Sequence, residues 1–208
     1  MTVTASGSKL VLASGSRVRR DMLTGAGLEI VVDPADVDEP SIEAAGRADG
    51  LSTPAIAEAL ALAKAEIVSA RHPGCLVIGA DQMLDVDGDS LRKPETMEQA
   101  ADTLRRLQGR DHTLISAVVL VRDGTLIWRH HASARLTMRA LGESDIRDYL
   151  ARAGEIVLTS VGAYQLEGIG AQLFKRIDGD YFTILGLPLL AVLDALRGID
   201  DGIEGLVS

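Results

Sequence analysis

The stretch "CLVIGADQMLDVDGDSL", residues 75–91, decides the fold of this chain. Its apolar first half predicts a buried strand, and we expect that strand to end at Asp81. The Asp87-Gly88 pair then predicts the turn of a hairpin, because Asp and Gly are favoured where a tight turn needs a positive φ. A buried strand that ends in a polar side chain is typical of α/β folds, in which ligands bind at strand ends.

Strand and helix patterns alternate on both sides of this stretch. On its N-terminal side the sequence predicts a strand over 9–14, a helix over 17–26, a strand running into an acidic turn over 28–39, a mobile loop over 39–54, and a helix over 53–72 with Thr53 as its N-cap. On its C-terminal side the sequence predicts a helix over 96–108, strands over 112–121 and 126–138 joined by an Asp123-Gly124 turn, and helices over 143–152 and 187–197. This alternation predicts a mixed α/β fold.

Length and charge exclude several classes of protein. With 208 residues, of which 47% are hydrophobic, the chain can bury a core for one domain or two packed lobes. Its formal net charge of -9 argues against a surface that binds polyanions, so we expect no nucleic-acid partner. No apolar run reaches the roughly 18 residues that a membrane span requires. Residues 1–9 also lack the apolar core of a signal peptide, so we expect a cytoplasmic protein with no membrane partner.

A cluster of cations stands out in this acidic chain. The segment "LVLASGSRVRR", residues 10–20, places three arginines directly after a Ser-Gly-Ser turn, at the predicted start of a helix. Backbone N–H groups at a helix N-terminus, together with hydroxyl groups and guanidinium forks, bind phosphate. Ser14, Ser16 and Arg19 are therefore candidate phosphate ligands, and a cluster of several cations suits a triphosphate better than a single phosphate.

Two carboxylates and a lysine follow other predicted strands. Glu39 lies in the acidic turn, Asp81 at the end of the buried strand, and Lys93 before a proline. Mg²⁺ takes oxygen ligands from one or two carboxylates plus substrate phosphates, so Glu39 and Asp81 are candidate metal ligands. Asp81 is also a candidate general base toward water. The chain has no G-x-x-x-x-G-K phosphate loop, and "GIGAQL" does not fit a dinucleotide-binding loop.

Five motifs, in order, resemble one known family. They are "LASGSRVRRDML", "ADVDE", "LALAKAE", "VIGADQ" followed by "RKP", and "VGAYQLEGIGAQLF" continuing to "LGLPL". Together they are similar to the Maf-like nucleoside triphosphate pyrophosphatases, also called septum formation proteins, over almost the whole chain. The chain departs from the family pattern at Arg17, where the family usually has proline, and at Arg92 in the Gly-Lys-Pro segment. Arg19 and Lys93 keep their places, so the resemblance implies that catalysis is retained.

The resemblance also implies a fold and a reaction. The fold would be a mixed α/β sheet of the Maf/Ham1 type flanked by helices, with a cleft between two lobes, in a single domain whose core covers about 9–198. The chain would be a homodimer that cleaves a nucleoside triphosphate between the α and β phosphates. The products would be a monophosphate and pyrophosphate, and the cofactor would be Mg²⁺ or Mn²⁺.

The candidate residues divide into three roles in this reaction. Asp81 would take a proton from the attacking water and contact the metal, which Glu39 would also bind. Transition states of this type need charge compensation more than covalent chemistry. The cations and hydroxyl groups that would supply this compensation are Arg19, Lys64, Lys93, Ser14 and Ser16.

Three further positions concern recognition of the base. By resemblance, members that act on dTTP and UTP tend to have Arg, Thr and Gln where this chain has Val18, Gln82 and Glu167. Members similar to the 7-methyl-GTP pyrophosphatases have an aromatic residue, Gln and Glu, and the chain matches this set at two positions. An ionised Glu167 only accepts hydrogen bonds, which suits the adjacent N–H donors of guanine or the amino group of cytosine. We therefore expect 7-methyl-GTP or another guanine- or cytosine-type triphosphate to be the preferred substrate.

Two alternative functions stay open. The chain could be a dTTP/UTP pyrophosphatase of the same family, which a comparison of substrates would decide. It could also be a regulator of cell division that senses a nucleotide without cleaving it. A pure sensor needs neither a general base nor a metal carboxylate, so steady release of pyrophosphate would exclude that function.

Overall fold

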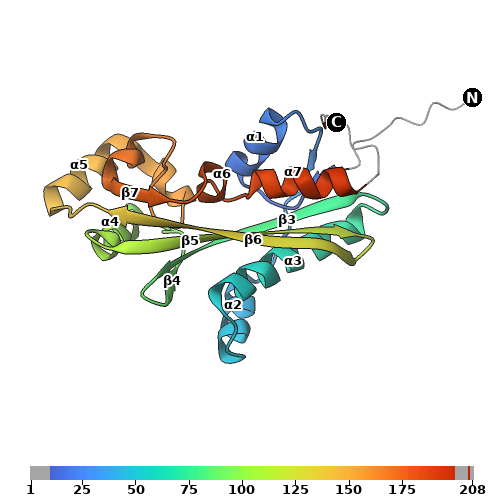
Figure 1. Cartoon of the computed structure of the whole chain (residues 1–208). Coiled ribbons are helices and arrows are strands. Elements are labelled where there is room, and N and C mark those ends of the chain that lie inside the picture. The colour runs from blue at the N-terminus through green and yellow to red at the C-terminus, as the bar shows by residue number, and fades with distance from the viewer. Residues whose placement is uncertain (1–9, 200–205, 207–208) are drawn as a thin grey trace, which may run out of the picture. The chain divides into compact units, whose positions relative to one another are not determined.

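The computed structural model describes residues 10–199 and residue 206 (Figure 1). In chain order the elements are β1 (Leu10–Leu12), α1 (Arg17–Gly25), β2 (Val31–Val32), α2 (Glu39–Ala48), α3 (Thr53–Arg71), β3 (Leu76–Val86), β4 (Asp89–Leu91), α4 (Met97–Leu107), β5 (Asp111–Arg122), β6 (Thr125–Met138), α5 (Glu143–Ala153), η1 (Gly154–Thr159), η2 (Ile169–Leu173), β7 (Phe174–Asp178), α6 (Tyr181–Ile184) and α7 (Leu189–Gly198). The strands form one sheet in the order β2-β1-β3-β5-β6-β7, with β4 paired to β3. β1 is parallel to both neighbours, whereas β4 and β7 are antiparallel to their partners, which confirms the predicted mixed α/β class.

The chain divides into two compact units. Among the described residues, the first unit comprises 10–81, 117–131, 186–199 and 206, and the second comprises Gln82–Ser116 and Ala132–Leu185. Strands β3, β5 and β6 therefore contribute residues to both units. The single domain implied by the family resemblance stays a prediction.

In the first unit, helix α3 packs closely on strand β3. Gly79 of β3 makes this approach possible, because a Cβ atom at that position would lie 2.2 Å from the carbonyl oxygen of Ala61. Ala61 and Ala65 of α3 are fully buried, and their small side chains let the helix backbone lie against the strand. The neighbouring strand β1 is buried along its whole length.

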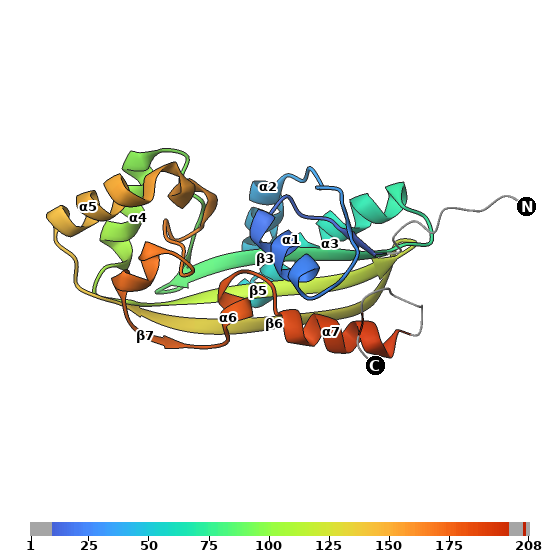
Figure 2. The ribbon, with the colours of Figure 1, turned by 90° about the horizontal axis from the view of Figure 1, so that it is seen from above.

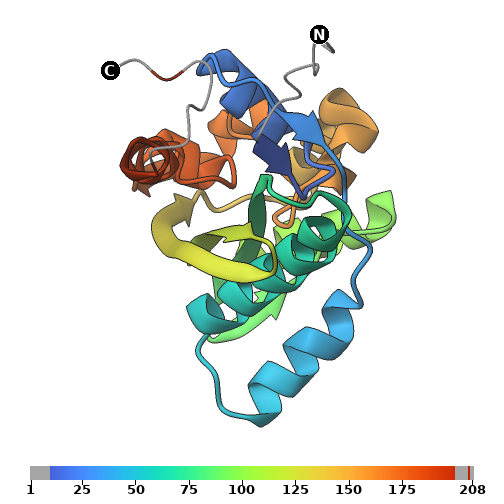
Figure 3. The same cartoon turned by 90° about the vertical axis from the view of Figure 1, so that its right-hand side faces the viewer.

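Residues 39–48 form helix α2, so the predicted mobile loop over 39–54 is wrong for most of its length. Asp38 caps this helix by accepting a hydrogen bond from Ser41 N (3.1 Å). Pro40 occupies the first turn, where a missing N–H group is tolerated. Gly46 packs against Ile56 of α3, and the chain turns back between the two helices (Figure 3). Most other residues of α2 are polar or exposed, so the apolar periodicity that predicts a helix is weak.

Two further details differ from the sequence prediction. Strand β3 continues through Asp81 to Val86, so Asp81 lies within a strand and not at its end. Pairing with β4 in the hairpin extends the strand beyond Asp81. The N-cap of α3 is Ser52 and not Thr53, and Ser52 makes no side-chain capping hydrogen bond.

In the second unit, α4 and α5 pack against each other (Figure 2) over a core of apolar side chains. The predicted Asp87-Gly88 turn is confirmed, with φ values of 55° and 87° between β3 and β4. The predicted helices over 96–108 and 143–152 correspond to α4 and α5. The sequence pattern does not predict β7 or α6, because these elements have only five and four residues.

Candidate active site

The start of α1 carries the first part of the site. Ser16 is the N-cap of this helix, and its hydroxyl oxygen accepts a hydrogen bond from Arg19 N (3.3 Å). Ser14 Oγ accepts hydrogen bonds from Ser16 N (3.3 Å) and from Arg19 Nη1 (3.0 Å). The three predicted phosphate ligands therefore lie together at the first turn of a helix, where the partial positive charge of the backbone favours anions.

Arg19 is buried and held by the backbone. Its side chain donates hydrogen bonds to the carbonyl oxygens of Gly186 (2.8 Å) and Ala80 (3.0 Å), and the residue is only 9% exposed. Burial lowers the pKa of the guanidinium group, and the charges of Asp81 and Glu39 oppose this shift. The arginine fork is thus preorganised in one position, which suits recognition of a phosphate group.

The other two arginines of the segment have a different environment. Arg17 and Arg20 are exposed, and both form ion pairs with Asp21 on the same helix. Exposed pairs of this kind contribute little to stability. The structure therefore singles out Arg19 from the predicted cluster.

Lys64 of α3 joins two carboxylates. Its Nζ atom lies 2.6 Å from Asp81 Oδ1 and 2.6 Å from Glu39 Oε1. Lys64 and Asp81 are buried, whereas the side chain of Glu39, at the start of α2, is 53% exposed. The close packing of α3 on β3 at Gly79 brings Lys64 to Asp81. The structure thus brings together the predicted base, the second predicted metal ligand and a predicted phosphate-binding lysine.

Two carboxylates that share one cation are a partial metal site. Among the described residues, no group of three or more His, Cys, Asp or Glu side chains is placed to hold a metal ion. Glu39 and Asp81 nevertheless meet at the ammonium group of Lys64, so their oxygens are already arranged around a positive charge. Mg²⁺ commonly uses one or two protein carboxylates and completes its shell with water and substrate phosphates. The donor set therefore fits a divalent ion that arrives together with substrate oxygens.

Gln82 of the second unit has a hydrogen-bond network of its own. Its Nε2 donates to Ser116 Oγ (3.1 Å) and to the carbonyl oxygens of Thr183 (3.2 Å) and Ile184 (3.0 Å). Ser116 is fully buried and donates its hydroxyl hydrogen to Thr183 O (2.8 Å). Sequence reasoning missed Ser116, although a serine inside the apolar run "LISAVVLV" indicates a buried hydroxyl that needs a partner.

The remaining predicted residues lie on exposed or half-buried positions. Lys93 is exposed on the segment between β4 and α4, Glu167 is exposed on the turn before η2, and Val18 is half-buried on α1. Burial raises the pKa of Tyr149 to about 12, and the Glu167 carboxylate adds to this rise. The charge of Glu167 thus acts on the core of the second unit, and the roles of Lys93, Glu167 and Val18 stay predictions.

A buried pair of His112 and Tyr164 is another feature that sequence reasoning missed. His112 Nε2 lies 2.7 Å from the Tyr164 hydroxyl group, and His112 is only 2% exposed. Burial lowers the pKa of His112 to about 4, against a smaller opposing effect of Asp111. The ring of Tyr164 also meets Phe174 edge-on at 4.8 Å. The sequence offered one indication of this pair, because a histidine next to a run of apolar strand residues is expected to be buried.

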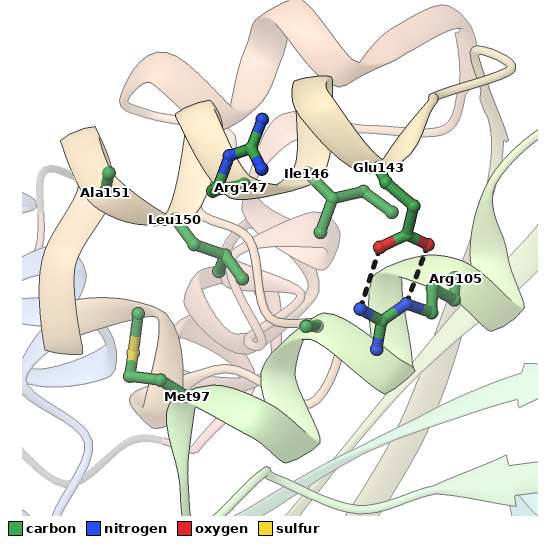
Figure 4. A pocket seen from close by; sticks show the side chains of 8 residues that line it. Met97, Arg105, Glu143, Ile146, Arg147, Leu150 and Ala151 are labelled. Carbon is green, nitrogen blue, oxygen red and sulfur yellow. Dashed lines mark hydrogen bonds and ion pairs between the residues drawn. The ribbon is translucent and has the colours of Figure 1, made fainter.

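A pocket with a volume of about 500 Å³ lies between α4 and α5 of the second unit (Figure 4). Its apolar lining includes Ile146 and Leu150, and two other lining residues, Arg105 and Glu143, form an ion pair at 2.8 Å. None of the residues that the sequence assigned to catalysis or to binding lines it. The pocket therefore shares no lining residue with the candidate site.

A group of cations and carboxylates beside a helix start, in a mixed α/β sheet, is typical of proteins that bind a phosphate-containing ligand. Comparison with known sequences gives the family. The chain belongs to the Maf-like protein family, whose sequence model matches residues 9–199. A "Nucleoside triphosphate pyrophosphatase" from Paramagnetospirillum magneticum is 53% identical over 90% of this chain and 96% of its own length. Proteins named "7-methyl-GTP pyrophosphatase" from Rhizobium etli and Mesorhizobium japonicum are 51% and 52% identical, over 93% of this chain and 98% of their own lengths.

Proposed function

We propose that this chain is an enzyme that hydrolyses a nucleoside triphosphate to a nucleoside monophosphate and pyrophosphate. The observation that carries the proposal is the buried cluster in which Lys64 contacts Asp81 and Arg19 contacts Ser14. Buried cations offset the charge of phosphate groups, and a carboxylate beside them can take a proton. The names of relatives that are 51–53% identical support the same reaction.

Asp81 is the general base of this mechanism. Its Oδ2 makes no hydrogen bond within the described residues, whereas Lys64 holds Oδ1 at 2.6 Å. Lys64 therefore fixes the carboxylate and leaves one oxygen to accept the proton of a water molecule. The water oxygen bonds to the α-phosphorus, the bond from this atom to the bridging oxygen breaks, and pyrophosphate leaves with that electron pair.

The cations and hydroxyl groups bind the triphosphate in this mechanism. Arg19, Ser14 and Ser16 bind phosphate oxygens at the start of α1, and the helix N-terminus adds its partial positive charge. Lys93 compensates the charge that develops on the leaving pyrophosphate. Positioning and charge compensation are the main contributions that an enzyme makes to such a reaction.

The metal in this proposal is Mg²⁺ or Mn²⁺. Glu39 and Asp81 would hold it, and the rest of its ligands would be water and phosphate oxygens. When bound, a divalent ion neutralises charge on the phosphates and orients them. Lys64 would keep its contact with Asp81 and add its positive charge beside the phosphate oxygens.

The same proposal assigns recognition of the base to Gln82 and Glu167. Both are expected to select 7-methyl-GTP or another guanine- or cytosine-type triphosphate over dTTP and UTP, because a carboxylate accepts hydrogen bonds and repels carbonyl oxygens. Val18 offers no aromatic face for stacking on a methylated, positively charged base. The preference for 7-methyl-GTP over GTP should therefore be small.

The setting of the enzyme is also part of the proposal. No helix in the part of the chain that the structure describes is long and apolar enough to cross a membrane. We propose a homodimer in the cytoplasm that binds its nucleotide substrate and no nucleic acid. The net charge of -9 supports the absence of a polyanion partner.

A panel of triphosphates tests the reaction. The purified protein would be incubated with 7-methyl-GTP, GTP, CTP, dTTP and UTP, with Mg²⁺, with Mn²⁺ and with a chelator. We expect equal amounts of monophosphate and pyrophosphate, only with metal, and faster turnover of the guanine and cytosine nucleotides. Release of orthophosphate instead of pyrophosphate, or no turnover with either metal, would overturn the proposal.

A further inference from the structure

The side-chain amide of Gln82 is held in one orientation. Its Nε2 lies 3.0 Å from Ile184 O, 3.2 Å from Thr183 O and 3.1 Å from Ser116 Oγ. Carbonyl oxygens only accept hydrogen bonds, so they must face the NH₂ group of the amide and not its oxygen. The hydrogen-bond partners therefore determine which end of Gln82 is nitrogen, although the two ends have nearly the same shape.

Ser116 completes this arrangement. It donates its hydroxyl hydrogen to Thr183 O at 2.8 Å, so its oxygen is left to accept a hydrogen bond from Gln82. Rotating the amide by 180° would place the Gln82 oxygen against the carbonyl oxygens of Thr183 and Ile184, which cannot donate, and this is unfavourable. The buried serine therefore adds a third acceptor to the two carbonyl oxygens that hold Nε2 of the amide.

The carbonyl groups that face Gln82 belong to Thr183 and Ile184, the last two residues of the short helix α6. Asp180 caps this helix, accepting hydrogen bonds from Thr183 N (3.0 Å) and from the Thr183 hydroxyl group. Gly179 lies directly against Ala134 of β6, where a Cβ atom would come within 2.5 Å of the alanine side chain. The acceptors around Gln82 Nε2 are thus part of a closely packed turn.

The Gln82 oxygen is the end of the amide that remains for a ligand. It makes no hydrogen bond within the described residues, and it is not among their buried atoms that lack a partner. An amide oxygen is an acceptor and cannot donate. Gln82 therefore offers a ligand the same kind of atom as Glu167, an acceptor, although glutamine as a residue type could offer either.

We propose that Ser116 is a positioning residue for base recognition, because together with the two carbonyl oxygens it holds Nε2 of Gln82 so that the amide oxygen faces a ligand, which favours bases with N–H donors on their pairing edge. This inference rests on the proposed function and names the chemistry of its base site. Guanine offers two adjacent donors, N1–H and the 2-amino group, to two acceptors. Uracil and thymine offer one donor between two carbonyl oxygens, so a second protein acceptor meets a carbonyl group.

Kinetic discrimination tests the proposal. Ser116→Ala removes one of the three acceptors that hold the amide, and we expect the ratio of kcat/KM for GTP to that for UTP to fall about three- to tenfold, the size of one neutral hydrogen bond. The loss should lie in KM for GTP more than in kcat. Ser69→Ala is the matched control, because Ser69 is also a buried serine, whose hydroxyl oxygen accepts a hydrogen bond from Gly124 N, and it should leave the ratio unchanged.

A double-mutant cycle separates positioning from a purely structural role. If Ser116 acts through Gln82, then Ser116→Ala should not change the GTP/UTP ratio further in a Gln82→Leu background. Equal losses for GTP and UTP in Ser116→Ala, or additive losses in the double mutant, would overturn the proposal. If Ser116→Ala does not fold, Gln82→Leu alone must still lower the ratio, and an unchanged ratio there also overturns it.

Base selection can also be measured by binding, without any cleavage of the nucleotide. Calorimetric titration of the same variants with GMP and UMP measures base selection in the bound state. If the wild-type protein cleaves no triphosphate, the proposed reaction fails, whereas a preference for GMP that Ser116→Ala removes would still support the inference. Equal affinities of the wild-type protein for GMP and UMP would overturn the inference about Ser116.

Discussion

The two units of the chain hold polar groups in the interior by different means. In the first unit the buried groups are charged, with Arg19 and Lys64 near the carboxylates of Asp81 and Glu39. In the second unit the buried groups around Gln82 and Ser116 are neutral hydrogen-bond donors and acceptors that contact one another. Buried charges are costly unless paired, whereas a satisfied neutral network has a smaller desolvation cost. The first arrangement suits a charged triphosphate, and the second suits a base that is recognised by hydrogen bonds.

The largest expected effect comes from removing a charge in the first unit. Asp81→Asn keeps the shape of the side chain but cannot take a proton, so turnover should fall by about 10² to 10⁴ while nucleotide binding survives. Steady-state kinetics and a binding titration measure the two quantities. Asp148→Asn, on an exposed position of α5, is the control for the loss of one negative charge. Turnover of Asp81→Asn near the wild-type value would remove Asp81 from the mechanism.

The neutral interior of the second unit should respond to pH through His112. Its pKa is about 4 in the folded chain, against about 6.5 for an unperturbed histidine. The unfolded chain therefore binds more protons between these values, so stability is full above about pH 6.5 and falls as the pH drops toward 4, by about 3 kcal/mol in all. His112→Gln should reduce this slope, measured as the denaturant midpoint against pH.

His130 supplies the control for this titration. It is half-buried, and it stacks on Trp128 at 5.7 Å between ring centroids. His130→Gln makes the same change of residue type at a site away from His112, and its slope is measured in parallel. An identical slope in wild type and His112→Gln would show that burial of His112 does not set the acid stability.

Arg19 tests whether the first unit recognises the phosphates by geometry or by charge alone. Arg19→Lys keeps the charge but loses the fork that holds Gly186 O and Ala80 O. We expect triphosphate binding to weaken about tenfold, with nucleoside binding unchanged, because the proposed mechanism assigns the fork to phosphate and not to the base. Calorimetry with a non-hydrolysable triphosphate and with the nucleoside gives both values. Equal losses for both ligands would contradict the assignment.

Lys64 tests whether the carboxylate pair is a metal site. Lys64→Gln removes the cation between Glu39 and Asp81, so Mn²⁺ alone should bind about tenfold more tightly than to the wild-type protein, even though catalysis is lost. The exposed Lys175 gives the control, since Lys175→Gln makes the same change in net charge. Calorimetry without nucleotide measures the affinity. Unchanged or weaker Mn²⁺ binding in Lys64→Gln would speak against a metal at this pair.

The smallest expected effect concerns Glu167. Glu167→Gln replaces an acceptor-only group with one that can also donate, so the preference for guanine-type triphosphates over dTTP and UTP should narrow about three- to tenfold. Relative kcat/KM values for GTP and UTP measure the change. A wild-type enzyme that prefers dTTP and UTP would reverse this assignment of specificity and leave the proposed pyrophosphatase reaction standing.

Much of the fold follows from local patterns. The Asp87-Gly88 turn, helix α4 and helix α5 lie where the sequence predicts them, because turn propensity and apolar periodicity act over a few residues. Local apolar periodicity does not predict helix α2, because this helix is stabilised by the cap at Asp38 and by packing of Gly46 on Ile56. The prediction that β3 ends at Asp81 is wrong for a similar reason, because pairing with β4 extends the strand to Val86.

The sequence by itself determined the mixed α/β class, the family, and the residue types from which the site is built. Only the tertiary structure decided that Arg19, and not Arg17 or Arg20, is the buried cation, since its backbone partner Gly186 is 167 residues away. The same holds for Lys64 between its two carboxylates and for the direction of the Gln82 amide. The physical reason is that backbone propensities and side-chain periodicity are local, whereas a buried polar group takes its position from partners that meet only when distant segments pack.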